Sequence, residues 1–299
     1  MNDFIGTEEN KPQQVFFEHY AKKVTNFFRI LFIVVARILF SKAPIRYSLV
    51  PYLFKRMSFL PYEWRLNMQA VARPYYGYPI FYALKLAKSL GYKKVSIVEF
   101  GVAGGNGLVN IEYHVREIQK KIDIDVEVYG FDVGSGLPKP VDYRDLPYQW
   151  KEGFYKMDLE KLKSRLKFSK LLIGDVKNTI EEFEGAPVAC VMFDLDYYSS
   201  TVDSLKIFNK PHLPRVFCYF DDVIGCNEIC LYNDFTGELL AINEFNQSNK
   251  MKITKLKNTA HFFKDTDFQD NLFVMHDFEH PEYGKYVNFE DGEACNLSS

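Results

Sequence analysis

Between residues 80 and 220 the chain alternates short apolar runs with stretches of helical periodicity, and this alternation restricts its possible folds more than any other feature. Five apolar runs predict strands, at residues 95–100, 126–131, 171–173, 188–193 and 216–220. Helices are expected at residues 80–90, 108–121 and 159–166, and a later strand at 272–275. Strands that alternate with helices predict an α/β fold, with a doubly wound, mostly parallel sheet and helices on both faces.

The composition supports a globular chain of this kind. It has 299 residues, of which 47% are hydrophobic and 25% charged. These values predict a domain with its own core and exclude a disordered, collagen-like or disulfide-dependent chain. The formal net charge is −2, so the whole chain gives no electrostatic reason to expect a nucleic-acid partner.

The cysteines and the first residues bear on the compartment. Five cysteines, an odd number without a regular framework, favour a reducing compartment, so we expect a cytoplasmic protein. Cys226 and Cys230 form a C-x3-C pair with no second Cys or His pair nearby, which favours free thiols over a zinc site. Residues 1–10 are acidic, unlike the start of a secretory signal.

Residues 1–65 are expected to form a basic, apolar helical arm before a main domain at 66–285 and a polar tail at 286–299. No acidic residue occurs between Glu18 and Glu63. The same stretch contains these basic residues: Lys22, Lys23, Arg29, Arg37, Lys42, Arg46, Lys55 and Arg56. Its longest apolar run, 30–36, is too short to span a membrane. Either the arm packs on the domain or on a partner subunit of a homo-oligomer, or residues 20–60 make peripheral contact with an anionic inner membrane face.

A glycine-rich segment directly follows the first predicted strand. It reads Glu99-Phe100-Gly101-Val102-Ala103-Gly104-Gly105-Asn106-Gly107. Glycines at this point let the backbone approach a ligand closely and leave amide groups free at a helix N-terminus. The spacing departs from the G-x-G-x-x-G of dinucleotide sites, because Asn110 stands where the third glycine belongs. We expect a ligand at this strand end rather than a plain turn.

Acidic residues also follow the second and third predicted strands. Asp132 comes after Gly130-Phe131 and before a glycine group that includes Gly136. A carboxylate there has two acceptor oxygens, which suit the two hydroxyls of a ribose. Asp175, which Val176 follows, either faces an adenine amino group or caps the next helix, and the two interpretations are about equally supported.

Four further acids follow the fourth and fifth predicted strands. Asp194 and Asp196 belong to an Asp-Leu-Asp sequence, and Asp221 and Asp222 are adjacent. Neighbouring parallel strands would bring these carboxylates to one edge of the sheet, where like charges resist ionising together. A divalent cation removes that conflict, and carboxylate oxygens suit Mg²⁺. The sequence therefore predicts a Mg²⁺ site at this edge.

In this order the blocks resemble class I S-adenosylmethionine (SAM) methyltransferases, and among them the metal-dependent sugar O-methyltransferases of the macrocin O-methyltransferase type. The resemblance covers about residues 70–250. It is carried by the strand-end acid with its glycine segment, and by these blocks: Gly130-Phe131-Asp132, Gly136-Leu137-Pro138, Asp194-Leu195-Asp196-Tyr197-Tyr198-Ser199-Ser200-Thr201 and Asp221-Asp222.

The resemblance implies a Rossmann-like seven-stranded sheet, SAM and Mg²⁺ as cofactors, and a hydroxylated small molecule or glycan as acceptor. Asp194, Asp221 and Asp222 would hold Mg²⁺, which would bind two oxygens of a vicinal diol and lower the pKa of the hydroxyl to be methylated. Asp194 or Asp196 would take the hydroxyl proton. The implied SAM-binding residues are Glu99, Gly101, Ala103, Gly104, Gly105, Asn106, Asp132, Gly136, Asp175 and Val176.

Several residues give weaker signals. The aromatic run Tyr75-Tyr76-Gly77-Tyr78 either lines the acceptor pocket or only packs, and Glu244 and Asn246 could reach the acceptor. Three histidines are expected to be structural rather than catalytic: His261, His276 and His280.

Two other functions are open on the sequence. Asp194-Leu195-Asp196 is also a D-x-D sequence, which in a metal-dependent glycosyltransferase would bind a metal–nucleotide-sugar complex. The glycine segment and the Asp221-Asp222 pair argue against that reading. The third possibility is a non-catalytic protein of the SAM-binding fold that docks on a membrane through its basic arm.

Overall fold

The computed structural model describes residues 57, 59–224, 232–256 and 270–287. The chain divides between Ala70 and Val71 into two units. In the first unit, helix α3 (Tyr62–Asn67) is described, and Arg65 Nε donates to the carbonyl oxygen of Leu60 at 3.3 Å. The expected basic arm lies almost wholly outside the described residues, as do Cys226, Cys230 and His261, so the expectations about them stay predictions.

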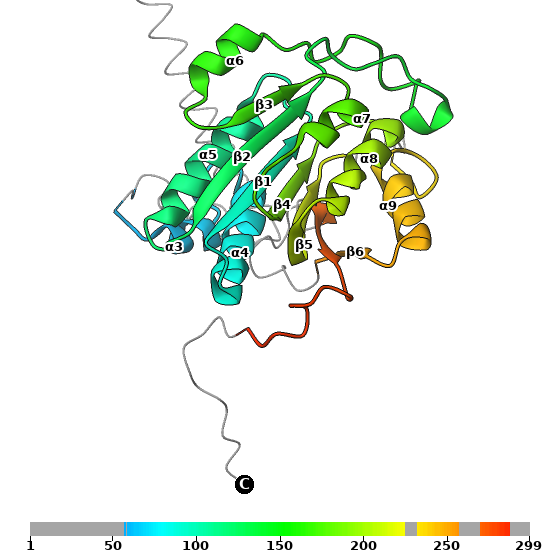
Figure 1. Ribbon diagram of the computed structural model, residues 1–299. Coiled ribbons are helices and arrows are strands. Elements are labelled where there is room, and N and C mark those ends of the chain that lie inside the picture. The colour runs from blue at the N-terminus through cyan, green and yellow to red at the C-terminus, as the bar shows by residue number, and fades with distance from the viewer. Residues whose placement is uncertain (1–56, 58, 225–231, 257–269, 288–299) are drawn as a thin grey trace, which may run out of the picture. The chain divides into compact units, whose positions relative to one another are not determined.

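The second unit contains a seven-stranded sheet in the order β3-β2-β1-β4-β5-β7-β6 (Figure 1). Its strands are β1 (Lys94–Phe100), β2 (Asp125–Asp132), β3 (Lys170–Ile173), β4 (Val188–Phe193), β5 (His212–Phe220), β6 (Lys252–Lys255) and β7 (Leu272–His276). The first five strands are parallel, and β7 runs antiparallel to both of its neighbours, β5 and β6. The doubly wound, mostly parallel fold expected from the sequence is confirmed.

Helices cover both faces of this sheet. On one face, α4 (Pro74–Leu90) and α5 (Asn106–Gln119) pack together, with α4 on β4 and β5 and α5 on β2. On the other, α7 (Val176–Thr179), α8 (Tyr198–Ser204) and α9 (Gly237–Ser248) pack in sequence. The remaining helix, α6 (Leu159–Arg165), precedes β3, and short 3-10 turns occur at Tyr143–Asp145, Ile180–Glu182 and Leu205–Asn209.

Phenylalanine rings form a continuous row across the sheet. Neighbouring ring centroids lie 4.7 Å apart between Phe131 and Phe100, 5.6 Å between Phe100 and Phe193, and 4.4 Å between Phe193 and Phe220. Phe273 on β7 extends the row edge-on to Phe220 at 5.2 Å. All five rings are buried. Each ring on a parallel strand is the last or next-to-last residue of that strand, so the row aligns the strand ends.

Two element boundaries differ from those expected, and proline is the reason in both. Helix α4 begins at Pro74 rather than near residue 80, because a proline at the first helical position has a suitable φ and loses no hydrogen bond there. Strand β5 begins at His212 rather than at 216, although it contains Pro214. The pairing of β4 with β5 shifts register between Val188 and Cys190, and a proline without an amide proton is tolerated at such an irregularity.

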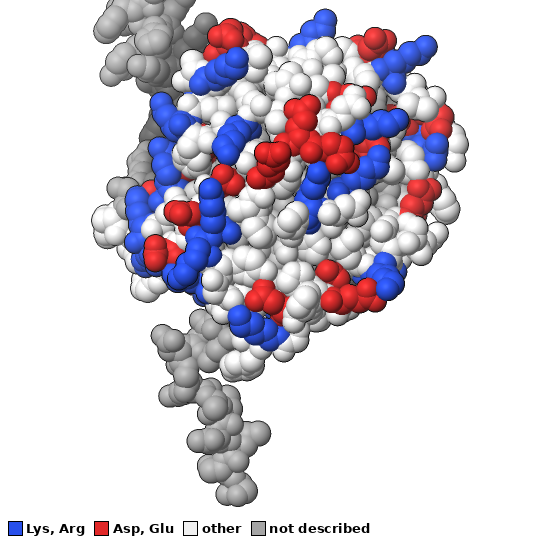
Figure 2. Space-filling view, viewed as in Figure 1, with Lys and Arg blue, Asp and Glu red and all other residues white. Residues whose placement is uncertain are grey.

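The surface of the second unit carries both signs of charge. On the face shown in Figure 2, acidic side chains gather where α7 and α8 lie, and lysine and arginine side chains surround them.

The longest described helix, α4, has 17 residues. No helix within the described ranges has the length and apolar character that crossing a membrane requires.

Candidate functional site

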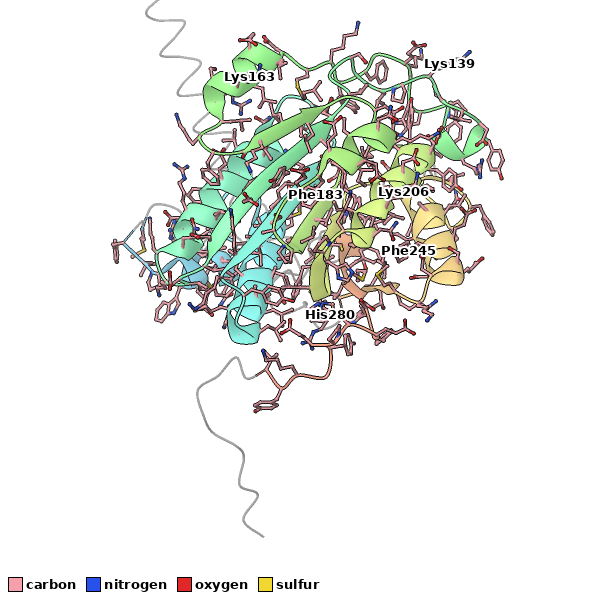
Figure 3. The ribbon with its side chains drawn as sticks, viewed as in Figure 1. Lys139, Lys163, Phe183, Lys206, Phe245 and His280 are labelled. Carbon is pink, nitrogen blue, oxygen red and sulfur yellow. The ribbon has the colours of Figure 1, made fainter. Side chains whose placement is uncertain are left out.

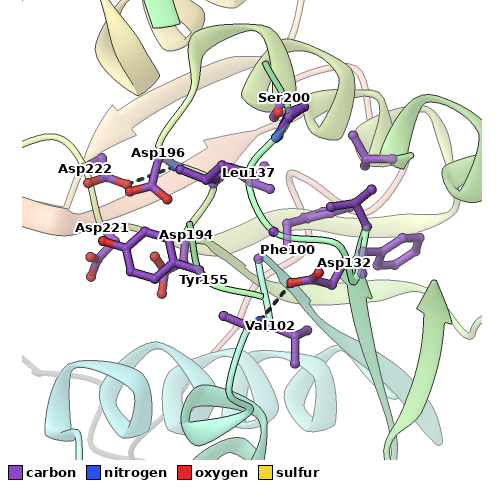
Figure 4. A pocket seen from close by; sticks show the side chains of 18 of the residues that line it. Phe100, Val102, Asp132, Leu137, Tyr155, Asp194, Asp196, Ser200, Asp221 and Asp222 are labelled. Atoms are coloured by element: carbon purple, nitrogen blue, oxygen red, sulfur yellow. Dashed lines mark hydrogen bonds between the residues drawn. The ribbon is translucent and has the colours of Figure 1, made fainter. Parts of the chain in front are cut away.

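A cavity of about 750 Å³ opens at the carboxyl ends of the parallel strands. The residues that follow β1, β2, β4 and β5 all contribute to its lining (Figure 4). The chain runs outward from β1 to β3 and then returns to β4, so the cavity lies at the point where the strand order reverses. This is where open α/β sheets bind ligands.

The glycine segment after β1 lies directly against the end of β4. Gly101 has φ +83°, and its amide donates to the carbonyl oxygen of Phe131 at 2.9 Å. A Cβ at this position would overlap the main-chain carbonyl of Asp194. A side chain at residue 101 would therefore push apart the two central strand ends.

Asp132 is fixed by two main-chain amides. Ala103 N donates to Oδ2 at 2.8 Å, and Gly134 N donates to Oδ1 at 2.6 Å (Figure 4 shows the first bond). Each carboxylate oxygen keeps a second lone pair, so Asp132 can still accept two ligand hydroxyls. The structure places this acid in the cavity, tied to the glycine segment.

The rest of the glycine segment is braced by α6. Arg165 donates from Nη1 to the Gly104 carbonyl at 2.6 Å and from Nη2 to Asn106 Oδ1 at 2.7 Å. Gly104 and Asn106 line the cavity, whereas Gly105 immediately precedes α5 and is not among the lining residues. Asn106 Oδ1 thus accepts from Arg165, and contact between Asn106 and a ligand stays a prediction.

The loop between β2 and α6 closes another side of the cavity. Gly136 has φ +90°, and a Cβ there would overlap the Phe154 carbonyl oxygen. Leu137 exchanges main-chain hydrogen bonds with Phe154 and Gly153, at 2.8 Å each. The buried Asp145 accepts from Ser199 N at 2.8 Å and from Val141 N at 2.9 Å, which ties the loop to α8.

Asp175 is the cap of α7. Its side chain accepts from Lys177 N at 2.9 Å, so the capping interpretation is confirmed. Asp175 and Val176 both also line the cavity, so the second interpretation, contact with a ligand, stays a prediction.

Glu99 is a buried acid at the base of the cavity. Its Oε1 accepts from Tyr76 OH at 3.1 Å, and its Oε2 has no hydrogen-bond partner among the described residues. Burial raises the pKa of Glu99 to about 8, although the Tyr76 bond and the nearby Arg73 oppose the shift. A buried oxygen without a donor costs free energy unless a ligand satisfies it.

The expected acidic cluster is present at the ends of β4 and β5. Asp194, Asp221 and Asp222 each place a carboxylate oxygen within 4.8 Å of the other two. Burial, and then the neighbouring Asp221 and Asp222, raise the pKa of Asp194 well above its usual range. None of these three forms an ion pair with a lysine or arginine within the part of the chain that the structure describes. A set of oxygen donors with this unrelieved repulsion fits a divalent cation.

Asp222 and Asp196 are linked to each other. Asp222 accepts from Tyr232 OH at 2.5 Å and from the Asp196 amide at 3.1 Å. Asp196 has φ +61°, which turns its side chain into the cavity beside the cluster. Burial and the Asp222 and Asp221 carboxylates raise the pKa of Asp196 to about 8, and burial raises that of Asp222 to about 6.

Four residues of this site have no signal in the sequence. Glu238, at the start of α9, is fully buried and accepts from the Asp222 amide at 3.0 Å. Asn271 Nδ2 donates to the Phe220 and Asp221 carbonyls at 2.5 and 2.8 Å, and so fixes the turn that carries the acid pair. Tyr155 and Arg73 line the cavity, and Figure 4 shows the Tyr155 ring in front of Asp194 and Asp221.

The weaker aromatic and C-terminal candidates lie elsewhere. Tyr76 and Tyr78 are buried, and Tyr75 stacks on Tyr219 at 5.3 Å, so this run packs behind the acids and none of it is in the lining. Asn246 exchanges two hydrogen bonds with the main chain of Ile253, which makes it structural. Glu244 accepts from Tyr198 OH at 2.5 Å and is not a lining residue.

The two described histidines among the candidates lie at the opposite edge of the sheet. His276 pairs in register with Arg215 near the start of β5 and contacts Tyr283 OH at 2.9 Å through Nδ1. Figure 3 shows His280 at the lower edge, whereas the cavity-lining Lys139 lies at the upper one. Neither histidine lines the cavity, as expected for structural residues.

Comparisons with known proteins give remote similarity only. No family model matches the sequence, and no curated protein matches it. The solved structure of CalS11, a calicheamicin methyltransferase, is 15% identical with a TM-score of 0.45, over 92% of this chain and 99% of that one. The O-methyltransferase NovP is 18% identical with a TM-score of 0.44, over 58% and 72%. TomG from Streptomyces achromogenes, an O-methyltransferase solved with SAM, is 15% identical with a TM-score of 0.37, over 81% and 93%.

Proposed function

We propose that this chain is a SAM- and Mg²⁺-dependent O-methyltransferase that methylates a hydroxyl of a sugar or glycan-type acceptor. One observation carries the proposal. A single cavity holds a glycine segment joined to the strand-end acid Asp132 on one side, and the Asp194, Asp221 and Asp222 cluster on the other. The first arrangement suits a nucleoside, and the second suits a divalent cation beside it.

The cofactor would lie along the ends of β1 and β2. Asp132 would accept the ribose hydroxyls, the backbone of Gly101 to Gly104 would face the rest of the molecule, and Asp175 and Val176 would border the base. When bound, SAM supplies an electrophilic methyl group on a sulfonium ion. The loop that Gly136 and Asp145 hold in place would border the cofactor on this side.

Asp194, Asp221 and Asp222 would hold Mg²⁺. When bound, the cation lowers the pKa of a coordinated hydroxyl and orients a diol. Two of these three residues are held in position by neighbouring side chains, because Glu238 and Asn271 bind the main chain of the Asp221-Asp222 turn. Hydrogen bonds to the residues that carry metal ligands keep the ligand oxygens in place.

Asp196 is the group that we assign to the acceptor proton. It lies next to the cluster without belonging to the set of three close oxygens, so its carboxylate is available to accept a proton. The acceptor oxygen would take the methyl group that bound SAM supplies, and the electron pair of the broken carbon–sulfur bond would stay on sulfur. The proton remains on an Asp196 carboxylate oxygen until it passes to water.

The first test is a calorimetric titration with S-adenosylhomocysteine, with and without Mg²⁺, beside a UDP-sugar. Micromolar binding of S-adenosylhomocysteine, followed by methylation of a hydroxylated acceptor that requires Mg²⁺, supports the proposal. Binding of the UDP-sugar instead would reassign Asp194 and Asp196 to a glycosyltransferase. Binding of S-adenosylhomocysteine with no metal effect at any acceptor would favour a non-catalytic binding protein.

A further inference from the structure

The first unit exposes apolar side chains where a chain in water normally exposes polar ones. Within residues 59–70, the side chains that are largely exposed belong to Phe59, Trp64 and Met68, with exposed fractions of 76%, 61% and 41%. Every polar or charged side chain in that range is less exposed than these three. Charged and polar residues are usually the most exposed ones, so this order is reversed. We call these three residues the α3 surface.

Helix α3 is apolar on two sides. Tyr62 and Leu66 are four residues apart, and both are buried. Met68 N donates to the Trp64 carbonyl at 3.0 Å, so the helical hydrogen-bond pattern continues and places the Trp64 and Met68 side chains together on another side. A helix that is apolar all round is normally covered on every side. The exposed side of α3 therefore suits a partner that removes it from water.

The sequence before and through the α3 surface indicates the charge of that partner. Residues 19–62 contain eight lysines and arginines and no aspartate or glutamate, a charge of +8. An anionic membrane surface attracts such a segment, and aromatic side chains concentrate at the boundary between headgroups and acyl chains. A second copy of the chain that met the first symmetrically would instead bring two segments of charge +8 together.

We infer that the α3 surface docks on an anionic membrane, with Phe59, Trp64 and Met68 entering the headgroup region. The basic residues that precede it in the chain supply the preference for anionic lipid. The contact is peripheral, because single aromatic side chains reach only the boundary between headgroups and acyl chains. Membrane contact does not depend on what the cavity binds, so it can be tested apart from the proposed function.

Trp64 itself is the probe. The chain has two tryptophans, Trp64 and Trp150, so Trp150→Phe leaves Trp64 as the single emitter. This variant of the whole chain is mixed with phosphatidylcholine vesicles, either pure or containing phosphatidylserine. With phosphatidylserine, we expect Trp64 emission to shift to shorter wavelengths and to be quenched by brominated acyl chains. Binding to these vesicles should be at least about 10-fold tighter than to the pure ones, and higher salt should weaken it.

Phe59→Ser tests the apolar part of the contact. It should weaken co-sedimentation with the phosphatidylserine vesicles about 10-fold, because one large apolar side chain no longer leaves water. Phe235→Ser is the matched control, since Phe235 lies in the second unit and is 75% exposed, as accessible as Phe59. The control should bind the vesicles normally. Thermal unfolding shows whether both variants are folded, and the emission of Trp64 in the Trp150→Phe protein depends on neither of them.

Four results would overturn the inference. The first is no binding to the phosphatidylserine vesicles, and the second is binding with unchanged Trp64 emission, which would place the contact elsewhere in the chain. The third is equal binding of the Phe59→Ser and Phe235→Ser variants, or equal binding to both kinds of vesicle. The fourth is a shift in Trp64 emission that grows with protein concentration in the absence of vesicles, which would show that a second copy covers the α3 surface.

Discussion

At the residue scale, Gly101 lies so close to the Asp194 carbonyl that no side chain fits between them. Gly101→Ala would add a Cβ that overlaps this carbonyl, at a φ of +83°. We expect a loss of about 2–4 kcal/mol in the free energy of unfolding, because strain and overlap act together. Urea denaturation followed by circular dichroism measures it.

Gly104 provides the matched control for this substitution. Nothing lies within 4 Å of a Cβ built there, and its φ is not in the left-handed region. Gly104→Ala should therefore change stability by less than about 0.5 kcal/mol. A comparable loss in both variants would show that the Asp194 contact is not what requires glycine at 101. Weaker binding of S-adenosylhomocysteine by a stable Gly104→Ala would indicate close approach of the ligand to the backbone.

The acidic cluster gives a second residue-scale prediction. Asp221→Asn removes one carboxylate from the set of three close oxygens that we propose to hold Mg²⁺. Mn²⁺, used as a spectroscopic substitute for Mg²⁺, should bind at least about 10-fold more weakly, while metal-free binding of S-adenosylhomocysteine stays within twofold. Titration monitored by electron paramagnetic resonance measures the first quantity, and calorimetry the second.

Asp203 serves as the control acid for that experiment. It lines the same cavity but pairs with Lys206 at 2.5 Å and is outside the cluster. Asp203→Asn should leave Mn²⁺ binding unchanged. Equal losses in the two variants would mean that the general negative charge of the cavity, and not a defined ligand set, attracts the cation.

At the element scale, the row of phenylalanines links the core to the site. Phe193 occupies the centre of the row, stacked on Phe220 and Phe100, and Asp194 is the next residue. Phe193→Leu should destabilise the domain by about 1–2 kcal/mol, through lost packing of a fully buried ring. It should also weaken Mn²⁺ binding, because the strand end that carries Asp194 loses the ring contacts that Phe193 makes with Phe100 and Phe220.

Phe168→Leu is the comparison for this prediction. Its ring is 38% exposed and lies outside the row, so the same exchange there should cost less than about 0.5 kcal/mol and leave metal binding unchanged. Chemical denaturation and Mn²⁺ titration of both variants test the link. A Phe193→Leu protein that is less stable but binds Mn²⁺ normally would show that the row supports only the core.

The elements also show what could be predicted from the sequence. The parallel strands were predictable because each apolar run ends on Phe followed directly by Gly or Asp, or on a Gly-Asp step, and such patterns are local. The starts of α4 and β5 could not be predicted in this way. Pro74 is permitted in the first turn of the helix, and Pro214 is permitted where the strand pairing shifts. Glu238 and Asn271 were missed because their contacts with the Asp221-Asp222 turn depend on where α9 and β7 pack.

At the scale of the whole molecule, Glu127 joins four parts of the sheet. Its carboxylate accepts from Ala186 N at 3.0 Å, before β4, and pairs with Lys94 on β1 at 3.0 Å and Lys170 on β3 at 3.1 Å. Partial burial opposes its ionisation, but the Ala186 amide and the two ammonium groups outweigh burial and lower the pKa of Glu127 to about 2. The folded state therefore binds this proton less readily than the unfolded chain.

The sign of the pH effect follows from this shift. The stabilisation by Glu127 is fully present above its unfolded pKa of about 4.5 and is lost as the pH falls from there toward about 2. Glu127→Gln should cost about 1–2 kcal/mol at pH 7, after allowance for solvent screening, and much less near pH 2.5. Glu160→Gln, at an exposed pair with Lys163, should have little effect at either pH. A pH-independent cost at residue 127 would assign its role to hydrogen bonding alone.

The row of five rings also determines how a chain of this kind can vary over evolutionary time. Each ring fixes one strand end, and on β1, β2, β4 and β5 the cavity residue is its immediate neighbour in the chain. Insertions between the strands lengthen surface loops and leave every ring beside its neighbour, at little entropic cost. Deletion of one residue within β4 would instead turn the ring to the opposite face of the sheet and move Asp194 with it. Loop segments without such contacts are therefore free to diversify in length and composition, while the positions of the strand-end residues are inherited as one unit.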